Sequence, residues 1–205
     1  METLKFRIFL VTVLFSSVFV NAQTANRQSA FSKSYEFENA SNYSSAIKEV
    51  KNVYDADDYF CNVRLGWLYY LTKNYTESIK YYDKAISLKP YAVEARFGCI
   101  KPLSAAENWE KVKAHYLQIL KIDPQNTTAN YWLGVIYYNR KEYGSAANLF
   151  GKVINLYPLD YDSVIMLAWT KLNLGKMGDA KVLFNHALTI RPNDSSALSG
   201  LKMIK

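Results

Sequence analysis

The sequence has few of the residues that break helices and few of those that perform most enzyme chemistry. Its 205 residues include only 8 glycines, 5 prolines, 2 cysteines and 2 histidines. The scarcity of glycine and proline argues against a disordered chain and against a loop-rich all-β fold. Half of the residues are hydrophobic, which is enough for a folded domain with a core of its own.

Runs of like charge are also lacking. The formal net charge is +7, but Lys and Arg are scattered along the chain. Scattered charge is typical of a solvated outer face, whereas a nucleic-acid site gathers its basic residues into a patch or stripe. We therefore expect no nucleic-acid partner.

Catalytic motifs are absent as well. The sequence contains no HExxH, paired CxxC, GxSxG or phosphate-binding glycine loop. His115 and His186 lie far apart, and each is better explained as a surface or packing residue. Cys61 and Cys99 are best explained as small buried hydrophobic residues, with a disulfide between them as the alternative. The sequence thus predicts no enzyme, no metal site and no cofactor.

The N-terminal segment has the pattern of a secretory signal. Lys5 and Arg7 precede an apolar run from Ile8 to Val20, which is too short for a membrane-spanning helix of about 20 residues. Val20 and Ala22 are small residues at the two positions that a signal peptidase reads. We expect a signal peptide over residues 1–22, cleavage after Ala22, and a periplasmic or secreted protein without stable membrane insertion.

The rest of the chain is periodic. Four prolines, each after a short apolar segment that ends a helical pattern, recur at intervals of 34 residues: Pro90, Pro124, Pro158 and Pro192. Proline does not continue a helix, so these positions mark four equivalent helix ends. Two residues after the prolines stand Ala92, Asn126, Asp160 and Asp194. Three of these four are good helix N-caps, which predicts that a new helix begins there.

Other positions repeat in the same register. Small residues recur in the middle of a first helix, at Leu65-Gly66, Leu133-Gly134 and Leu167-Ala168, and in a second helix, at Ala46, Ser78, Ala146 and Ala180. Four residues further on, the second helix carries Val50, Tyr82, Tyr116, Phe150 and Phe184. These spacings place the residues on one helix face and predict closely packed helix pairs.

Together these positions resemble the tetratricopeptide repeat, a helix–turn–helix unit of 34 residues, and the signal makes the sequence similar to an exported bacterial member of that family. The resemblance implies an all-α, right-handed superhelical solenoid over residues 23–205. Its five repeats would span about 27–58, 59–92, 93–126, 127–160 and 161–194, with a short capping helix in 195–205. The first unit is atypical, as is common for terminal repeats.

The third unit departs from the pattern because Pro102 falls inside its first helix. Proline there removes a backbone hydrogen bond and clashes with the carbonyl of Gly98. We expect this helix to kink or stop near Lys101 and residues 102–107 to be partly irregular. This is either a shortened helix or a change of curvature that shapes a groove.

The resemblance also implies a concave face lined by the first helices. Mapping that face by repeat position gives a set rich in aromatic side chains: Phe31, Tyr35, Phe60, Val63, Trp67, Tyr70, Phe97, Lys101, Tyr131, Tyr138, Asn139, Ile165, Trp169 and Asn173. Tyr and Trp offer a large contact area with few rotors. The set therefore predicts a groove for a peptide segment of a partner protein, although the same aromatic residues could instead pack on one another.

Other functions remain open. The carboxylate-clamp type of tetratricopeptide domain is disfavoured, because only Arg64 and Lys101 are even roughly placed for it, and Trp67 and Val135 stand where asparagine is needed. The leading hypothesis is a non-enzymatic scaffold or adaptor of the cell envelope. The alternatives are a structural module that self-associates through its ends and aromatic faces, and a carbohydrate-binding protein whose aromatic rings stack on sugars.

Overall fold

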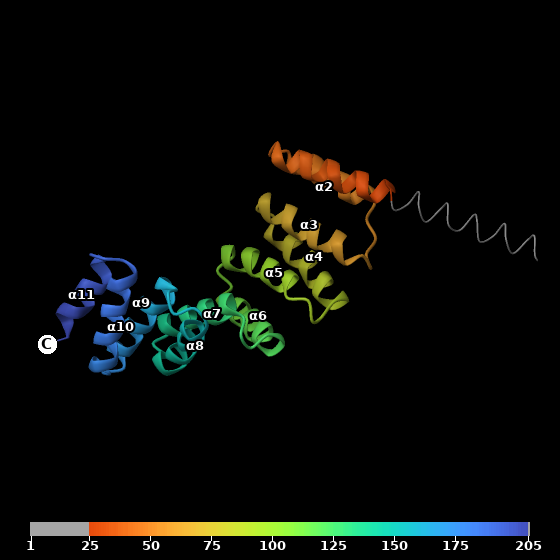
Figure 1. Ribbon diagram of the computed structural model, residues 1–205. Coiled ribbons are helices and arrows are strands. Elements are labelled where there is room, and N and C mark those ends of the chain that lie inside the picture. The colour runs from red at the N-terminus through yellow and green to blue at the C-terminus, as the bar shows by residue number, and fades with distance from the viewer. Residues whose placement is uncertain (1–24, 205) are drawn as a thin grey trace, which may run out of the picture. The chain divides into compact units, whose positions relative to one another are not determined.

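The computed structural model describes residues 25–204, and every regular element in this range is a helix (Figure 1). Residues 25–39 are helical, and the helices that follow are α2 (Tyr43–Asn52), α3 (Tyr59–Leu71), α4 (Tyr75–Leu88), α5 (Glu94–Ala105), α6 (Trp109–Ile122), α7 (Thr127–Asn139), α8 (Tyr143–Leu156), α9 (Tyr161–Asn173), α10 (Met177–Ile190) and α11 (Ser195–Met203). None of the helices in this range is both long enough and apolar enough to cross a membrane. The predicted signal peptide, 1–22, lies outside the described residues.

The described chain divides into two compact units. The first unit ends at Glu107 and holds helical residues 25–39 and α2 to α5, and the second begins at Asn108 and holds α6 to α11. The boundary between the units falls inside residues 93–126, the predicted third repeat. Helices α5 and α6 therefore belong to different compact units.

The predicted helix ends are where the 34-residue pattern places them. Each of the four spaced prolines is the second residue after the end of α4, α6, α8 or α10. The predicted N-caps Asn126, Asp160 and Asp194 each accept a backbone N–H three residues further on, at 2.8–3.0 Å. Helix α5, which follows Ala92, has Val93 at its N-cap and no side-chain cap.

The two helices of each pair are joined by a turn with one left-handed residue. These residues occupy equivalent positions, two before the second helix begins, and have φ between 56° and 73°: Ser41, Lys73, Glu107, Lys141 and Gly175. Only the last of them is glycine, the residue that adopts this conformation without steric cost. The turn geometry is therefore shared by all five pairs although the residue type is not.

In the first unit, one tyrosine ring of α4 packs against two neighbouring helices. Tyr82 is 2% exposed, and a Cβ built on Gly66 of α3 would lie 2.9 Å from its ring. A Cβ built on Gly98 of α5 would lie only 2.2 Å from the same ring. The lack of a side chain at both glycines lets α3 and α5 approach α4 closely.

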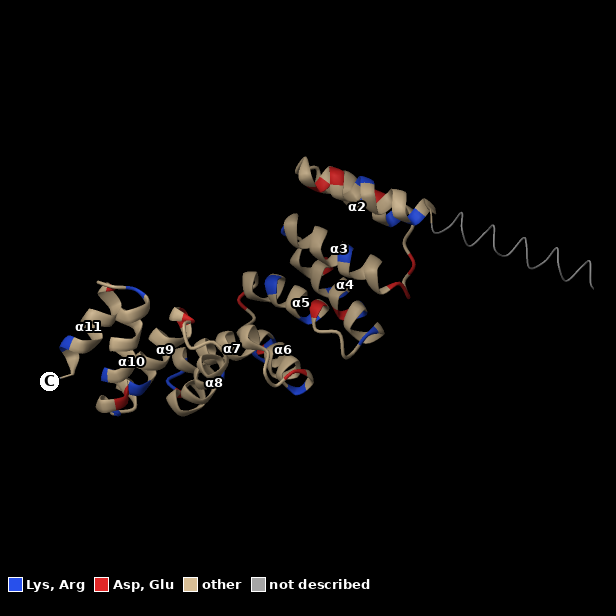
Figure 2. Cartoon of the chain, in the orientation of Figure 1, with Lys and Arg blue, Asp and Glu red and all other residues tan. Residues whose placement is uncertain are grey.

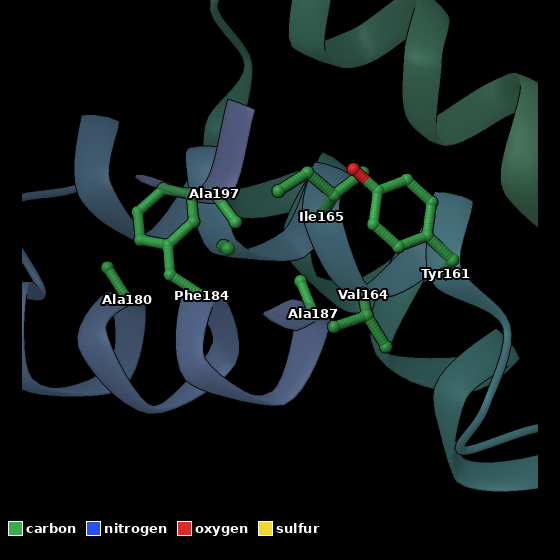
Figure 3. Packing of buried hydrophobic residues seen from close by; sticks show 8 residues of the cluster. Tyr161, Val164, Ile165, Ala180, Phe184, Ala187 and Ala197 are labelled. Atoms are coloured by element: carbon green, nitrogen blue, oxygen red, sulfur yellow. The ribbon is translucent and has the colours of Figure 1, made fainter. Parts of the chain in front are cut away.

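The second unit repeats this arrangement with phenylalanine. A Cβ built on Gly134 of α7 would lie 2.8 Å from the ring of Phe150 in α8, and one built on Gly200 of α11 would lie 2.1 Å from the ring of Phe184 in α10. Figure 3 shows Phe184 with Ala180 and Ala187 on α10, facing Ala197 of α11. The predicted capping helix thus covers the last pair with its small residues Ala197 and Gly200. The larger Leu198 of the same helix does not take part in this packing and is 41% exposed.

The predicted stop near Lys101 is wrong, because residues 102–105 are helical. Helix α5 continues through Pro102 to Ala105 and loses only the hydrogen bond that the proline cannot donate. Pro102 and Leu103 are both buried, and the carbonyl of Pro102 accepts the N–H of Ala106 at 3.0 Å. The proline lies in the last turn of the helix. Burial of these side chains offsets the lost hydrogen bond.

Both cysteines are buried, and no disulfide joins them. Cys61 lies in the core cluster of the first unit, where its thiol is 3.9 Å from the carbonyl of Val53. Burial raises the pKa of the Cys61 thiol. The predicted burial of Cys61 and Cys99 is therefore confirmed and the alternative of a disulfide is not, while the thiol of Cys99 lies 3.9 Å from a carboxylate oxygen of Asp83.

Gly200→Ala should destabilise the second unit by about 1–3 kcal/mol, because the added methyl group overlaps the buried ring of Phe184. Gly151 of α8 offers a matched control, since a Cβ there meets nothing within 4 Å. Gly151→Ala should leave stability unchanged or raise it by about 0.5–1 kcal/mol. Urea unfolding followed by circular dichroism measures both, and equal midpoints for the two variants would contradict this account of the packing.

Candidate functional site

The first unit contains a cleft between helical residues 25–39 and α3. It has a volume of about 360 Å³. Five of its lining residues belong to the predicted groove, Phe31, Tyr35, Phe60, Val63 and Trp67, and three do not, Glu38, Asn39 and Arg64. A second pocket of about 350 Å³ shares Phe31 and Phe60 with it and adds Arg27 and Gln28. We call the two together the aromatic cleft.

The floor of the aromatic cleft is tied together by Glu38. One of its carboxylate oxygens accepts the indole N–H of Trp67 at 2.6 Å, and the other pairs with the guanidinium of Arg64. Arg64 is only 5% exposed, and it also donates to the hydroxyl of Ser34 at 3.0 and 3.1 Å. The buried guanidinium is thus paired and hydrogen-bonded, as a buried charge requires.

Several cations lie over the aromatic faces of the cleft. The guanidinium of Arg64 is 3.9 Å from the centre of the Tyr35 ring, and that of Arg27 is 5.6 and 5.5 Å from Phe31 and Phe60. The ammonium of Lys101 on α5 lies 5.7 Å from the Trp67 ring. Figure 2 shows basic residues on both α3 and α5. Cation–π contacts hold these rings in place while leaving Tyr35 and Phe60 more than half exposed.

Arg64 is not available to a ligand carboxylate, because Glu38 already occupies its guanidinium. The other predicted residues of this unit lie beside the cleft. Tyr70 packs on Trp67 and Tyr75 with ring centres 5.6 and 6.1 Å apart, and Phe97 is half-buried on α5. The structure therefore brings together the predicted residues of the helix at 25–39 and of α3.

The predicted residues of the second unit are mostly engaged in its own packing. The Trp169 ring meets Phe184 edge to face at 5.1 Å, and its indole N–H donates to Ser196 of α11 at 2.9 Å. Ile165 is buried, and Tyr138 accepts a hydrogen bond from the side chain of Asn173 at 3.3 Å. Trp169 thus holds the capping helix, which the sequence pattern alone did not indicate.

The second unit has a pocket of its own that the sequence analysis missed. It lies at the beginnings of α7 and α9 and has a volume of about 290 Å³. Its lining includes the predicted Tyr131 and otherwise Thr127, Thr128, Trp132, Val153, Asp160, Asp162 and Ser163. The register position of Trp132 varies from repeat to repeat, with Arg64, Gly98, Met166 and Gly200 at the equivalent places, and this variability is the one sequence signal for a residue not needed for helix packing.

Comparison with known proteins agrees with the helix-pair architecture. Three family models described as tetratricopeptide repeats match residues 60–92, 128–160 and 161–194. The chain is a tetratricopeptide repeat protein. Among curated proteins, none matches it significantly.

Solved structures resemble this tetratricopeptide repeat protein in fold. A tetratricopeptide repeat protein from Parabacteroides merdae has a TM-score of 0.74 at 18% identity, over 88% of this chain and 72% of that one. MamA has a TM-score of 0.70 at 17% identity, over 80% and 91% of the two chains. A further MamA structure, labelled AMB-1, has a TM-score of 0.69 at 20% identity, over 86% and 96%. The tetratricopeptide repeat is generally a non-enzymatic module for protein–protein interaction.

Glu38→Gln should lower the free energy of unfolding of the first unit by about 2–3 kcal/mol, because it leaves the buried guanidinium of Arg64 without a charged partner. Glu36→Gln is the control, since Glu36 is exposed and accepts only a hydrogen bond from Ser32. Chemical unfolding of both variants measures the difference. A loss for Glu38→Gln no larger than that for Glu36→Gln would show that the pair does not stabilise this unit.

Proposed function

We propose that this tetratricopeptide repeat protein is an interaction scaffold whose aromatic cleft binds a short peptide segment of a partner protein. The observation that carries the proposal is the exposure of Tyr35 and Phe60, at 53% and 58%, above a floor that is held rigidly by Glu38. Exposed aromatic rings on an ordered floor are the usual anchors of protein interfaces.

The length of the cleft suits a segment of a few residues. Phe60 and Trp67 both line it and are seven residues apart on α3, which corresponds to about 10 Å along a helix axis. An extended peptide covers that distance with about three residues, and its alternate side chains point the same way. We infer that two apolar side chains, at positions i and i+2 of the partner, enter the cleft.

The chemistry of the lining favours an apolar segment that also carries polar backbone groups. Phe31, Phe60 and Val63 supply apolar surface, and the side-chain amide of Asn39 is able to bond a peptide carbonyl or N–H. The carboxylate of Glu38 and the guanidinium of Arg64 are already paired with each other. Specificity would then come from the shape of the apolar anchors more than from a charged group of the ligand.

Site-specific photocrosslinking tests the proposal. With a benzoylphenylalanine replacing Tyr35 or Phe60, one at a time, irradiation of producing cells should give the same adduct from both positions. Benzoylphenylalanine at Tyr91 is the control, because Tyr91 is 84% exposed in the same unit and lines neither pocket of the cleft.

Phe60→Ser should then abolish the adduct formed from position 35 while leaving the thermal unfolding curve unchanged, because Phe60 is mostly exposed. An adduct at twice the mass of the chain would indicate self-association instead of a different partner. An adduct formed equally from position 91 would contradict binding in the cleft.

We also propose that the protein is exported, with cleavage after Ala22. The support is the sequence pattern of residues 1–22. Ala22→Trp should block cleavage, because signal peptidase requires a small residue there, whereas Ala25→Trp should not. Mass spectrometry of the protein from producing cells should find a chain that begins at Gln23 in the wild type and in Ala25→Trp, and an uncleaved precursor in Ala22→Trp. A wild-type chain that retains residues 1–22 would refute the proposal.

A further inference from the structure

The pocket at the beginnings of α7 and α9 belongs wholly to the second unit and has no part in the aromatic cleft. Asp160 and Asp162 both line it, from the N-cap and first turn of α9. Figure 2 shows the acidic residues at this end of α9. We call it the acidic pocket.

No cationic side chain in the described part of the chain pairs with the carboxylates of the acidic pocket. Neither Asp160 nor Asp162 forms an ion pair there, although seven ion pairs occur among the same residues. One oxygen of Asp160 accepts the N–H of Ser163 at 2.9 Å, which leaves its other oxygen and the carboxylate of Asp162 for a ligand. Burial raises the pKa of Tyr131, and the charges of Asp162 and Asp160 raise it further.

An open indole lies beside these carboxylates. Trp132 is 49% exposed, and its ring meets Tyr131 edge to face at 5.2 Å. At the equivalent positions, Gly98 and Gly200 make room for an aromatic ring of the preceding helix. The same position also holds Arg64 and Met166 in other repeats, so a large side chain is tolerated there, and in this repeat Trp132 adds an aromatic face to the acidic pocket.

A buried hydroxyl also lines the acidic pocket without a partner. Ser163 is 0% exposed, and its Oγ forms no hydrogen bond with any described residue. The equivalent positions in other repeats hold small residues that bury no hydroxyl: Cys61, Ala95, Ala129 and Ala197. Leaving a buried hydroxyl unpaired is unfavourable, so this substitution in the pattern points to a ligand that donates a hydrogen bond to it.

We propose that the acidic pocket binds an arginine or lysine side chain from a basic segment of a partner protein. Such a side chain compensates the two carboxylates, stacks on the indole of Trp132 and donates to Ser163. A sugar ring would also stack on Trp132 and bond the carboxylates, but it would leave both charges uncompensated. Charge complementarity therefore favours the basic side chain. This site is separate from the aromatic cleft and independent of the proposal made for it.

Titration of the full chain with a short synthetic peptide tests this assignment. The probe is acetyl-Gly-Arg-Gly-Arg-Gly-amide, and its control carries citrulline in place of arginine, which has nearly the same shape without the charge. The indole N–H resonance of Trp132, assigned by Trp132→Phe, should shift saturably with the arginine peptide. Binding of the citrulline peptide should be at least about tenfold weaker.

Two double variants show whether the carboxylates are responsible. Asp160→Asn/Asp162→Asn removes both charges and keeps an N-cap at position 160, and should weaken binding at least about tenfold. Asp179→Asn/Asp194→Asn removes the same charge from the same unit, including the N-cap of α11, but neither residue lines the pocket. It should change binding less than about twofold.

Three results would overturn the proposal. Equal binding of the citrulline peptide would show that charge is not recognised, and equal losses in the two double variants would show a general effect of net charge. A Trp132 shift with a neutral chito-oligosaccharide but none with the arginine peptide would assign the pocket to a sugar.

Discussion

The packing of one aromatic ring against two neighbouring helices holds this repeat structure together. In the first unit Tyr82 fills the space left by Gly66 and Gly98, and in the second Phe184 fills the space beside Gly200. The ring fits only because the glycines have no side chain. Without the ring, the space between the helices would be a cavity, which destabilises a protein interior. One ring thus contacts both the other helix of its own pair and the first helix of the next pair. This packing fixes the helices that carry the surface residues of each unit.

The two surface sites arise where side chains depart from that pattern. In the aromatic cleft, helical residues 25–39 provide Glu38, which pairs with Arg64 and orients Trp67. In the acidic pocket, Trp132 stands at a position that varies between repeats, and Ser163 replaces a small apolar residue. Positions that recur from repeat to repeat account for the packing, and residues peculiar to one repeat form the two proposed binding sites.

The helices and their ends could be predicted from the sequence because they depend on local rules. Proline cannot continue a helix and Asn or Asp caps one, so Pro124 and Asn126 located a helix boundary by themselves. The course of α5 through Pro102 could not be predicted in the same way, since burial of Leu103 offsets a local cost. The pairing of Glu38 with Arg64 links residues 26 apart on separate helices, and no spacing rule indicates it. The repeat register predicts Trp169 in the groove, but whether a half-buried indole faces a ligand or a capping helix depends on packing.

Contacts in this protein join residues that are close along the chain. Among the described residues, side-chain hydrogen bonds span at most 35 positions, as in the contact between Tyr59 and Glu94, which is about one repeat. Closing such short loops costs little entropy, so a structure of this kind is expected to form quickly. Each helix pair therefore packs against its neighbours without requiring contacts to distant parts of the chain.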